Sequence, residues 1–298
     1  MATYHTPNIY PGYRGIANVG GNQFRFADAN ITAKQEVRLE DIVMGTWDYD
    51  AYVYGPVDIS GSINGPATEN FVTGGASSIW QWATKRQPPC GEMLENDVEL
   101  WYYCGSAGNN YRKFSKLLVN TVGFSCAAGD IAQFTLDVMG YLPPTAWASS
   151  TPPLFTSVEK FITWDKVSIT LTPGADGGFT SPPISMRWSN FDFTVANQLT
   201  PQYAIVPTGA SPAPNLFPVD VVPGLRKLTG TMTCYNIPMS NGVDRWDDYL
   251  ANNFGSITFN IASIALTFNC RFHRVEPASK VGPITSTIGF TGVGNQPW

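Results

Sequence analysis

FRFADANIT at residues 24–32 is followed, 162 residues later, by MRWSNFDFT at residues 186–194. Both stretches have arginine at the second position, an aromatic residue at the third, Asp or Asn at the fifth and seventh, and threonine at the last. Repeats of solenoid proteins have periods of about 20–50 residues, far shorter than this one. The spacing is that of a whole domain, and we therefore expect one domain to be duplicated in tandem.

Further matches follow in the same order in both halves. ISGSI at residues 59–63 corresponds to LTGTM at residues 228–232, and each is centred on a glycine. A short helix with one apolar side is predicted next in each half, at residues 76–85 and 243–252. Coincidence between two β-rich halves is the alternative explanation, but it does not account for the shared order.

Alternation of apolar and polar residues predicts short strands in much of the chain. The turn AAGD at residues 127–130 predicts a hairpin. We expect an irregular N-terminal arm at residues 1–22 and a linker at 143–160, which leave domains at 23–142 and 161–298. The predicted strands are residues 30–39, 57–63, 98–104, 116–125 and 131–139 in the first half, and 161–172, 186–195, 228–232, 256–262, 264–272 and 283–292 in the second.

Few charged residues and many aromatic, proline and glycine residues characterise this chain of 298 residues. Charged residues make up 14% of it, against about 25% in an average domain, which indicates that partners cover much of the surface. The net charge of −5 argues against binding nucleic acid through its phosphates, because that requires clustered Lys and Arg. With 23 prolines and 28 glycines, the composition favours many strands and turns. The fold class is therefore predicted to be mainly β.

The sequence contains no recognisable pattern for catalysis, cofactor binding or a metal site. Its two histidines, His5 and His273, belong to no catalytic arrangement, and it has no phosphate-binding loop, dinucleotide-binding glycine motif or nucleophile elbow. The five cysteines lack CxxC spacing, which argues against zinc and favours buried thiols in a reducing compartment. No secretion signal or membrane-spanning apolar run is recognisable either. We expect no enzyme, no cofactor and no metal.

Two segments, residues 40–57 and 198–224, are longer than ordinary connections, whose median length is about 4–6 residues. They combine few charges with aromatic or proline residues, and such a composition is typical of interface cores. The alternative is that each segment folds over its own sheet and covers an edge. The candidate inter-subunit contact residues are Trp47, Tyr49, Tyr52, Tyr54, Tyr203 and Phe217.

Together these features resemble the tail tube proteins (major tail proteins) of tailed bacteriophages, in a tandem-duplicated form. In each half a strand precedes a long segment, and the glycine-centred strand, the short helix and a closing hairpin follow. In the first half that hairpin is formed by residues 119–125 and 134–140. The resemblance covers residues 20–142 and 160–298. It implies two tandem tail-tube-type domains of β-sandwich or half-barrel form, each with a short flanking helix.

The resemblance also implies partners and a role. Such proteins form rings that stack into a hollow tail tube, through which DNA passes without specific binding. Most such rings hold six single domains, so three copies of this chain would form a ring with pseudo-sixfold symmetry and a negatively charged lumen. The implied partners are other copies of the chain, the tape measure, tail terminator, and baseplate or distal tail proteins, and a sheath if the tail is contractile. The implied location is the virion tail, assembled in the bacterial cytoplasm without a membrane.

Two alternatives from other classes remain open. A carbohydrate- or receptor-binding β-sandwich module would use exposed Trp and Tyr side chains to stack on sugars, and duplication would raise its avidity. The second is another virion component, such as a capsid decoration protein or a tail terminator, which copy number per virion would distinguish.

Overall fold

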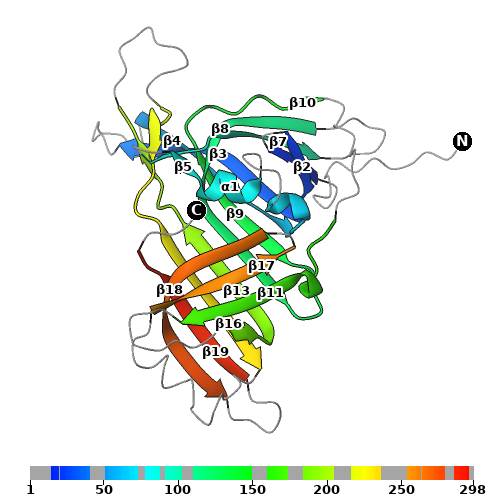
Figure 1. Ribbon diagram of the computed structural model, residues 1–298. Helices are drawn as coiled ribbons and strands as arrows, with labels where there is room; N and C mark the ends of the chain where they lie inside the picture. The colour runs from blue at the N-terminus through cyan, green and yellow to red at the C-terminus, as the bar shows by residue number, and fades with distance from the viewer. Residues whose placement is uncertain are drawn as a thin grey trace, which may run out of the picture.

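Strands dominate the protein. The computed structural model describes residues 15–19, 21–40, 51–72, 78–87, 91–102, 110–149, 160–173, 184–204, 216–235, 254–262, 264–278 and 285–294. In these ranges, 15 strands belong to one continuous antiparallel sheet, and two further pairs of short strands lie outside it (Figure 1). The described residues contain a single α-helix, α1 (Ile79–Thr84). The prediction of a mainly β fold is therefore confirmed.

The elements follow one another in two series. Up to residue 149 they are β1 (Gly15–Val19), β2 (Asn22–Arg25), β3 (Asp28–Glu40), β4 (Ala51–Pro66), the 3-10 helix η2 (Glu69–Phe71), α1, β5 (Arg86–Gln87), β6 (Glu92–Met93), β7 (Asn96–Tyr102), β8 (Asn110–Ala127), β9 (Gln133–Gly140) and β10 (Ala148–Ser149). From residue 160 they are the 3-10 helix η5 (Trp164–Lys166), β11 (Val167–Pro173), β12 (Ile184–Met186), β13 (Trp188–Ala196), β14 (Thr200–Gln202), β15 (Asp220–Val222), β16 (Lys227–Tyr235), β17 (Phe254–Ile261), β18 (Ile264–Ala278) and β19 (Thr285–Gly292).

Most predicted elements are present, and α1 lies inside the segment predicted to be helical. The helix begins after Ser78, whose Oγ accepts a hydrogen bond from the N–H of Gln81 (3.2 Å), as an N-cap serine should. The predicted turn at residues 127–130 connects β8 to β9, and Gly129 adopts a φ of +95° there. The second predicted helix, residues 243–252, lies outside the described residues.

Three sequence predictions need correction. Residues 15–19 and residue 22 are not irregular, because β1 pairs with both β2 and β7 and extends the sheet. Residues 51–57 are not loop, because β4 begins at Ala51 and pairs with β3 from there on. The extra strand begins at Val167 rather than at residue 161, because η5 precedes it. Local pattern missed the first two pairings because both depend on a distant partner strand.

The two halves have the same order of strand pairing. It runs β3–β4–β9–β8–β7 in the first half and β13–β16–β19–β18–β17 in the second. The registers agree as well: Ile31 lies opposite Gly61, and Phe193 lies opposite Gly230. Gly61 then lies opposite Val138, and Gly230 opposite Phe290. The duplication itself stays a prediction, and this shared register is the observation that supports it.

The halves are joined through a direct strand pair. Strand β8 of the first half pairs with β13 of the second over seven residue pairs, from Asn190 opposite Ala127 to Ala196 opposite Thr121. Strand β9 pairs with residues 118–125 of β8, so β9 and β13 flank β8 on opposite edges. The eight strands β3, β4, β9, β8, β13, β16, β19 and β18 therefore follow one another across a single curved sheet (Figure 1).

One aromatic core lies behind this sheet and spans both halves. Phe193 of β13 packs against Phe259 of β17 and Phe268 of β18, with ring centroids 4.9 and 5.4 Å away. Trp80 of α1 contacts Phe193 edge-on at 5.9 Å, so the helix of the first half covers the core of the second. Trp82, fully buried, donates from its indole N–H to the carbonyl of Leu117 (3.1 Å). The helix therefore helps to fix the two halves relative to each other.

The two central glycines allow close approach of neighbouring strands. A Cβ on Gly61 would lie 2.5 Å from the Cα of Ile31, and one on Gly230 would lie 2.5 Å from the carbonyl oxygen of Asp192. Real Cβ atoms do not come within 3.0 Å of other heavy atoms. The glycine in each of the two matching pentapeptides is thus required by the strand that it faces.

Gly61→Ala and Gly230→Ala should each lower the free energy of unfolding by about 1–3 kcal/mol, because the added methyl group overpacks the sheet. Gly123→Ala in β8 is the matched control, since its Cβ would meet no atom closer than 3.7 Å. Urea unfolding followed by tryptophan fluorescence measures the difference. Equal midpoints for Gly61→Ala and Gly123→Ala would contradict this account.

Candidate assembly site

One face of the eight-strand sheet is polar and consists mostly of small side chains. It is the face opposite the aromatic core, because residues alternate between the two sides of each strand. Neighbouring strands bring hydroxyl groups side by side: Thr233 and Thr287 are 3.3 Å apart at their Oγ1 atoms, and Thr231 donates to the carboxylate of Asp192. Its Ser, Thr and Asn members, all exposed or half-buried, are Asn30, Thr32, Ser60, Ser62, Asn64, Thr121, Ser125, Thr135, Asn190, Thr194, Thr229, Thr231, Thr233, Thr287 and Thr291.

The charges described on this polar face nearly balance. They are Asp28, Asp58, Asp137 and Asp192, against Lys34, Lys227 and Arg271. Burial raises the pKa of Asp137, and a hydrogen bond with Thr121 partly opposes that rise. With four negative and three positive described charges, the face has little attraction for a polyanion.

The polar face ends at two strand edges. At one end, β3 pairs with β4 alone among the described strands. At the other end, β18 continues beyond Arg271, the last of its residues that pairs with β17. In a paired strand edge the backbone N–H and C=O groups are hydrogen-bonded to the neighbouring strand. At an open edge these groups are unpaired, and a strand of another chain can bind to them. The two ends of the sheet are therefore candidate contact surfaces.

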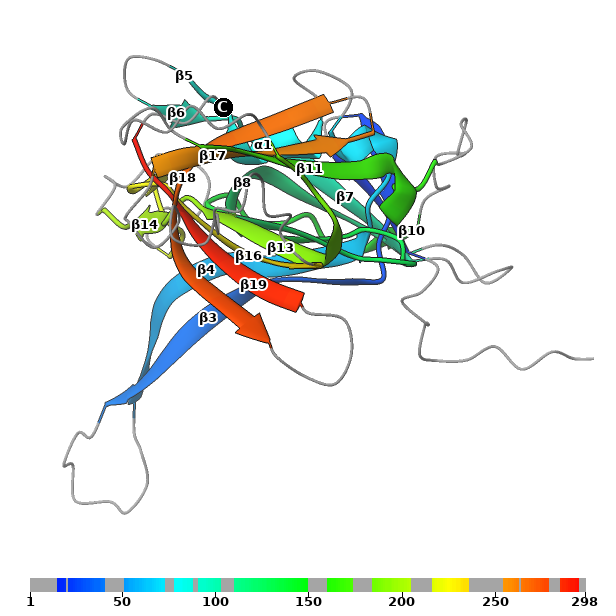
Figure 2. The same cartoon turned by 60° about the horizontal axis from the view of Figure 1, so that its bottom comes forward.

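The β3–β4 hairpin extends well beyond the body of the protein, as Figure 2 shows. Its ladder continues to Glu40 opposite Ala51, with a bulge between Gln35 and Val37. Tyr52 and Tyr54, two of the predicted contact residues, belong to β4 within this hairpin. The other two from this segment, Trp47 and Tyr49, lie outside the described residues.

Tyr203 and Phe217, predicted from the second long segment, contact the chain itself. The hydroxyl of Tyr203 donates to the Asp58 carboxylate on β4, and burial with this contact raises the pKa of Tyr203 well above its usual value. Phe217 is half-buried against the main core, and the neighbouring Leu216 carbonyl accepts a hydrogen bond from Val57 (2.5 Å). Residues 203 and 216 of this segment therefore lie against β4 of the first half, and Tyr203 still has 41% of its surface exposed.

A buried amide, Asn197, holds the halves together where β13 ends. Its side chain has no exposed surface, and its Nδ2 donates to the carbonyls of Ala83 in α1 (2.8 Å) and Val119 in β8 (2.9 Å). Its Oδ1 accepts from Nε of Arg226 (2.9 Å). Burial, and then the charge of Arg86, lower the pKa of Arg226 to about 10. Sequence inspection did not identify this amide, because its partners come from three separate segments.

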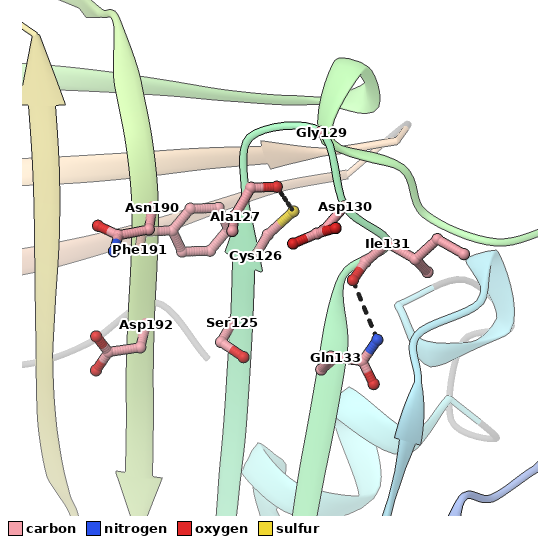
Figure 3. A pocket seen from close by; sticks show the side chains of 10 residues that line it. All are labelled: Ser125, Cys126, Ala127, Gly129, Asp130, Ile131, Gln133, Asn190, Phe191 and Asp192. Atoms are coloured by element: carbon pink, nitrogen blue, oxygen red, sulfur yellow. Dashed lines mark hydrogen bonds between the residues drawn. The ribbon is translucent and has the colours of Figure 1, made fainter.

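A surface pocket of about 690 Å³ lies at the other end of the β8–β13 pair, between β13 and the β8–β9 turn (Figure 3). Cys126, Asp130 and Asp192 are among its lining residues. Burial, with a smaller contribution from Asp130, raises the pKa of Cys126 to about 11, so this thiol is protonated and unreactive at neutral pH. Its lining includes no histidine or lysine that could act as a base, and we assign it no chemistry.

The described cysteines are structural. Cys126, Cys234 and Cys270 are buried thiols, and burial raises the pKa of Cys270 to about 12. Among the described residues no group of His, Cys, Asp and Glu could hold a metal ion. No helix in the same ranges is long and apolar enough to cross a membrane.

The described part of the chain is thus a curved β-sheet with one polar face, an aromatic core behind it and two ends without a described partner strand. Residues 2–292 match the family described as phage tail tube protein. The chain therefore belongs to the phage tail tube protein family and is a structural component of the virion tail. No curated protein matches the sequence. The family match favours the tail tube over a carbohydrate-binding module or another virion component.

Asn197→Ala should lower the free energy of unfolding by at least about 2 kcal/mol, because two buried carbonyls and a guanidinium N–H lose their partner. Asn190→Ala is the control, since Asn190 is an exposed amide in β13, the strand that ends just before Asn197. Thermal unfolding of both variants measures the difference, and similar midpoints would show that Asn197 is not essential for stability.

Proposed function

We propose that three copies of this chain form a ring with pseudo-sixfold symmetry, and that such rings stack into the hollow tail tube through which DNA passes. Each chain contributes two ring units, one from each half. The shared strand order and register of the halves support this count. Two corresponding units joined in one chain would halve the number of chains that a six-unit ring needs.

The polar sheet face is proposed to line the lumen. Its small hydroxyl and amide side chains carry no charge, and its four described aspartates slightly outnumber its described cations, Lys34, Lys227 and Arg271. The opposite face cannot have this role, because Phe124, Phe193 and Phe290 on that side are buried in the core. DNA would then slide past a wall that has little attraction for it.

The long β3–β4 hairpin is proposed to contact the neighbouring subunit or ring. It extends from the body beyond the rest of the sheet (Figure 2), where a partner could be reached. Tyr52 and Tyr54 in β4, with Trp47 and Tyr49 from the segment between β3 and β4, would supply the apolar contact area, since aromatic residues are enriched at interface hot spots. Tyr203 and Phe217 would support this contact indirectly, by holding residues 198–204 and 216–224 against β4.

No catalytic role belongs to this proposal. The protein acts by assembly, in the bacterial cytoplasm, with the tape measure, terminator and baseplate or distal tail proteins as its further partners. Electron microscopy of the purified chain and of virions tests the core of the proposal: stacked rings with a central channel are the expected result. A particle that stays monomeric in every condition would overturn it.

Asp192→Lys should leave ring and tube formation intact but slow DNA delivery. Three chains would place three added lysines around one level of the lumen, where they attract phosphate. Asp165→Lys in η5, an exposed position off this face, is the control with the same charge change. Infectivity and the salt dependence of DNA release from purified virions measure the effect. Equal loss for both variants would show that position on the polar face is irrelevant.

Trp47→Ala combined with Tyr54→Ala should reduce tube growth by about tenfold or more while rings still form, since hot-spot aromatics contribute about 2 kcal/mol or more. Trp164→Ala, which truncates a tryptophan that is 48% exposed, is the control. Tube lengths in negative-stain images give the readout. Normal tubes from the double variant would argue against the hairpin contact.

A further inference from the structure

The two open ends of the polar sheet have the same geometry as a junction that already exists inside the chain. Residues 270 and 271 of β18 pair with both β17 and β19, so these two strands flank β18 on opposite edges. On the β17 edge, residues 274–278 continue beyond Arg271 and pair with no described strand. The other edge of residues 274–278 pairs with β19. The same arrangement is found in β8, where residues 121–125 pair with β9 on one edge and with β13 on the other.

Strands β8 and β18 correspond residue by residue. Val138 of β9 and Phe290 of β19 are equivalent, because each lies opposite a central glycine. Val119 of β8 lies opposite Val138, and Phe272 of β18 lies opposite Phe290. A bulge follows at once in both strands, between Val119 and Thr121 and between Phe272 and Arg274. Residue 121 of β8 therefore corresponds to residue 274 of β18, and the correspondence continues to residue 125 of β8 and residue 278 of β18.

Strand β3 corresponds in the same way to β13. Ile31 and Phe193 lie opposite the two central glycines. In the chain, Thr194 of β13 lies opposite Gly123 of β8. The position equivalent to Thr194 is Thr32, and the position equivalent to Gly123 is Glu276.

From this correspondence we propose that β3 of one copy pairs with residues 274–278 of β18 in the next copy, in the register of the β8–β13 junction. The partner is a second copy of this chain, and the inference rests on the proposed ring. It goes further by naming the two edges and the facing residues. The residue pairs are Asn30 with Ala278, Ile31 with Pro277, Thr32 with Glu276, Ala33 with Val275 and Lys34 with Arg274.

The internal junction also defines which pairs exchange hydrogen bonds. The N–H of Asn197 donates to the carbonyl of Asn120, and the N–H of Ala128 to that of Ser189, each at 2.7 Å. Bonded and non-bonded pairs alternate along an antiparallel ladder. Phe193 with Phe124 is consequently a bonded pair, and Thr194 with Gly123 is a non-bonded pair, whose side chains lie closer together.

The junction between copies is weaker than the internal one because of a proline in the backbone ladder. Pro277 takes the place of Phe124, and because proline has no N–H, the carbonyl of Ile31 loses its donor. A weaker pair suits a contact that must form only during assembly, whereas the covalently connected junction forms as the chain folds.

Cysteine cross-linking tests the register. The non-bonded pair Thr32→Cys with Glu276→Cys places the two Cβ atoms about 4.5–5.5 Å apart, close to the separation that a disulfide requires. Mild oxidation of assembled tubes should give dimers and trimers on a non-reducing gel, and the ladder should end at three chains. Each single variant controls for the native cysteines and should give no ladder.

An off-register pair supplies the matched control. Thr32→Cys with Ala278→Cys lies on the same face but on a diagonal of about 7–8 Å, and its yield should be at least about fivefold lower. Asn30→Cys with Ala278→Cys tests the same register at the next non-bonded pair. Tubes that are visible by electron microscopy but cross-link through neither in-register pair would overturn the junction and leave the tube function standing. An unmodified chain that forms no tubes would overturn the proposed function and the junction with it.

Pro277→Thr provides a second, independent measurement. Restoring the backbone N–H should strengthen the junction. Rings of the Pro277→Thr variant should therefore dissociate at a higher guanidinium concentration than rings of the unmodified chain. Pro201→Thr, in the separate two-stranded sheet of β14 and β15, is the control. The variant could instead form normal tubes whose rings dissociate at the same or a lower guanidinium concentration than those of the unmodified chain. That result would show that Pro277 lies outside the junction.

Discussion

The ladder between β8 and β13 is the interaction on which the rest of this protein depends. It joins the strands of the first half and those of the second half into one curved sheet with a single polar face. It also brings Phe124 and Phe193 to a ring distance of 5.7 Å, so that the aromatic core continues from one half into the other. Asn197 and α1 hold the same joint from the side, and the halves therefore cannot move apart without exposing buried polar groups.

The alternation of side chains across this surface explains how one chain serves two environments. Phenylalanine, isoleucine and valine fill the interior side, and threonine, serine and aspartate cover the other. Hydroxyl groups that bond to their neighbours across strands make this surface polar without adding charge. The low fraction of charged residues, 14%, agrees with a chain whose edges and flanks meet partners.

Much of the fold was predictable from local pattern. Period-2 alternation located β3, β9, β13, β16, β17 and β19, and the shared apolar side of Ile79, Trp80 and Ala83 located α1. The matching pentapeptides around Gly61 and Gly230 predicted strands that face equivalent partners, and their registers agree. Prediction failed for β1, β2 and the start of β4. Their strand conformation is stabilised by pairing: β1 pairs with β7 and β2, and the start of β4 pairs with β3. No local sequence pattern reports such pairing.

The sequence by itself determined the class of fold, the position of the repeated strands and the absence of recognisable catalytic patterns. These follow from composition and periodicity, which are properties of short windows of residues. Only the tertiary structure decided which strands are neighbours, which face is polar throughout, and which edges stay open, because strand order and register depend on residues far apart in the chain. The contacts of Asn197 with α1, β8 and Arg226 have the same origin, and so does the place of Tyr203 against β4. Local sequence specifies the strands, and long-range hydrogen bonding and burial arrange them into a wall.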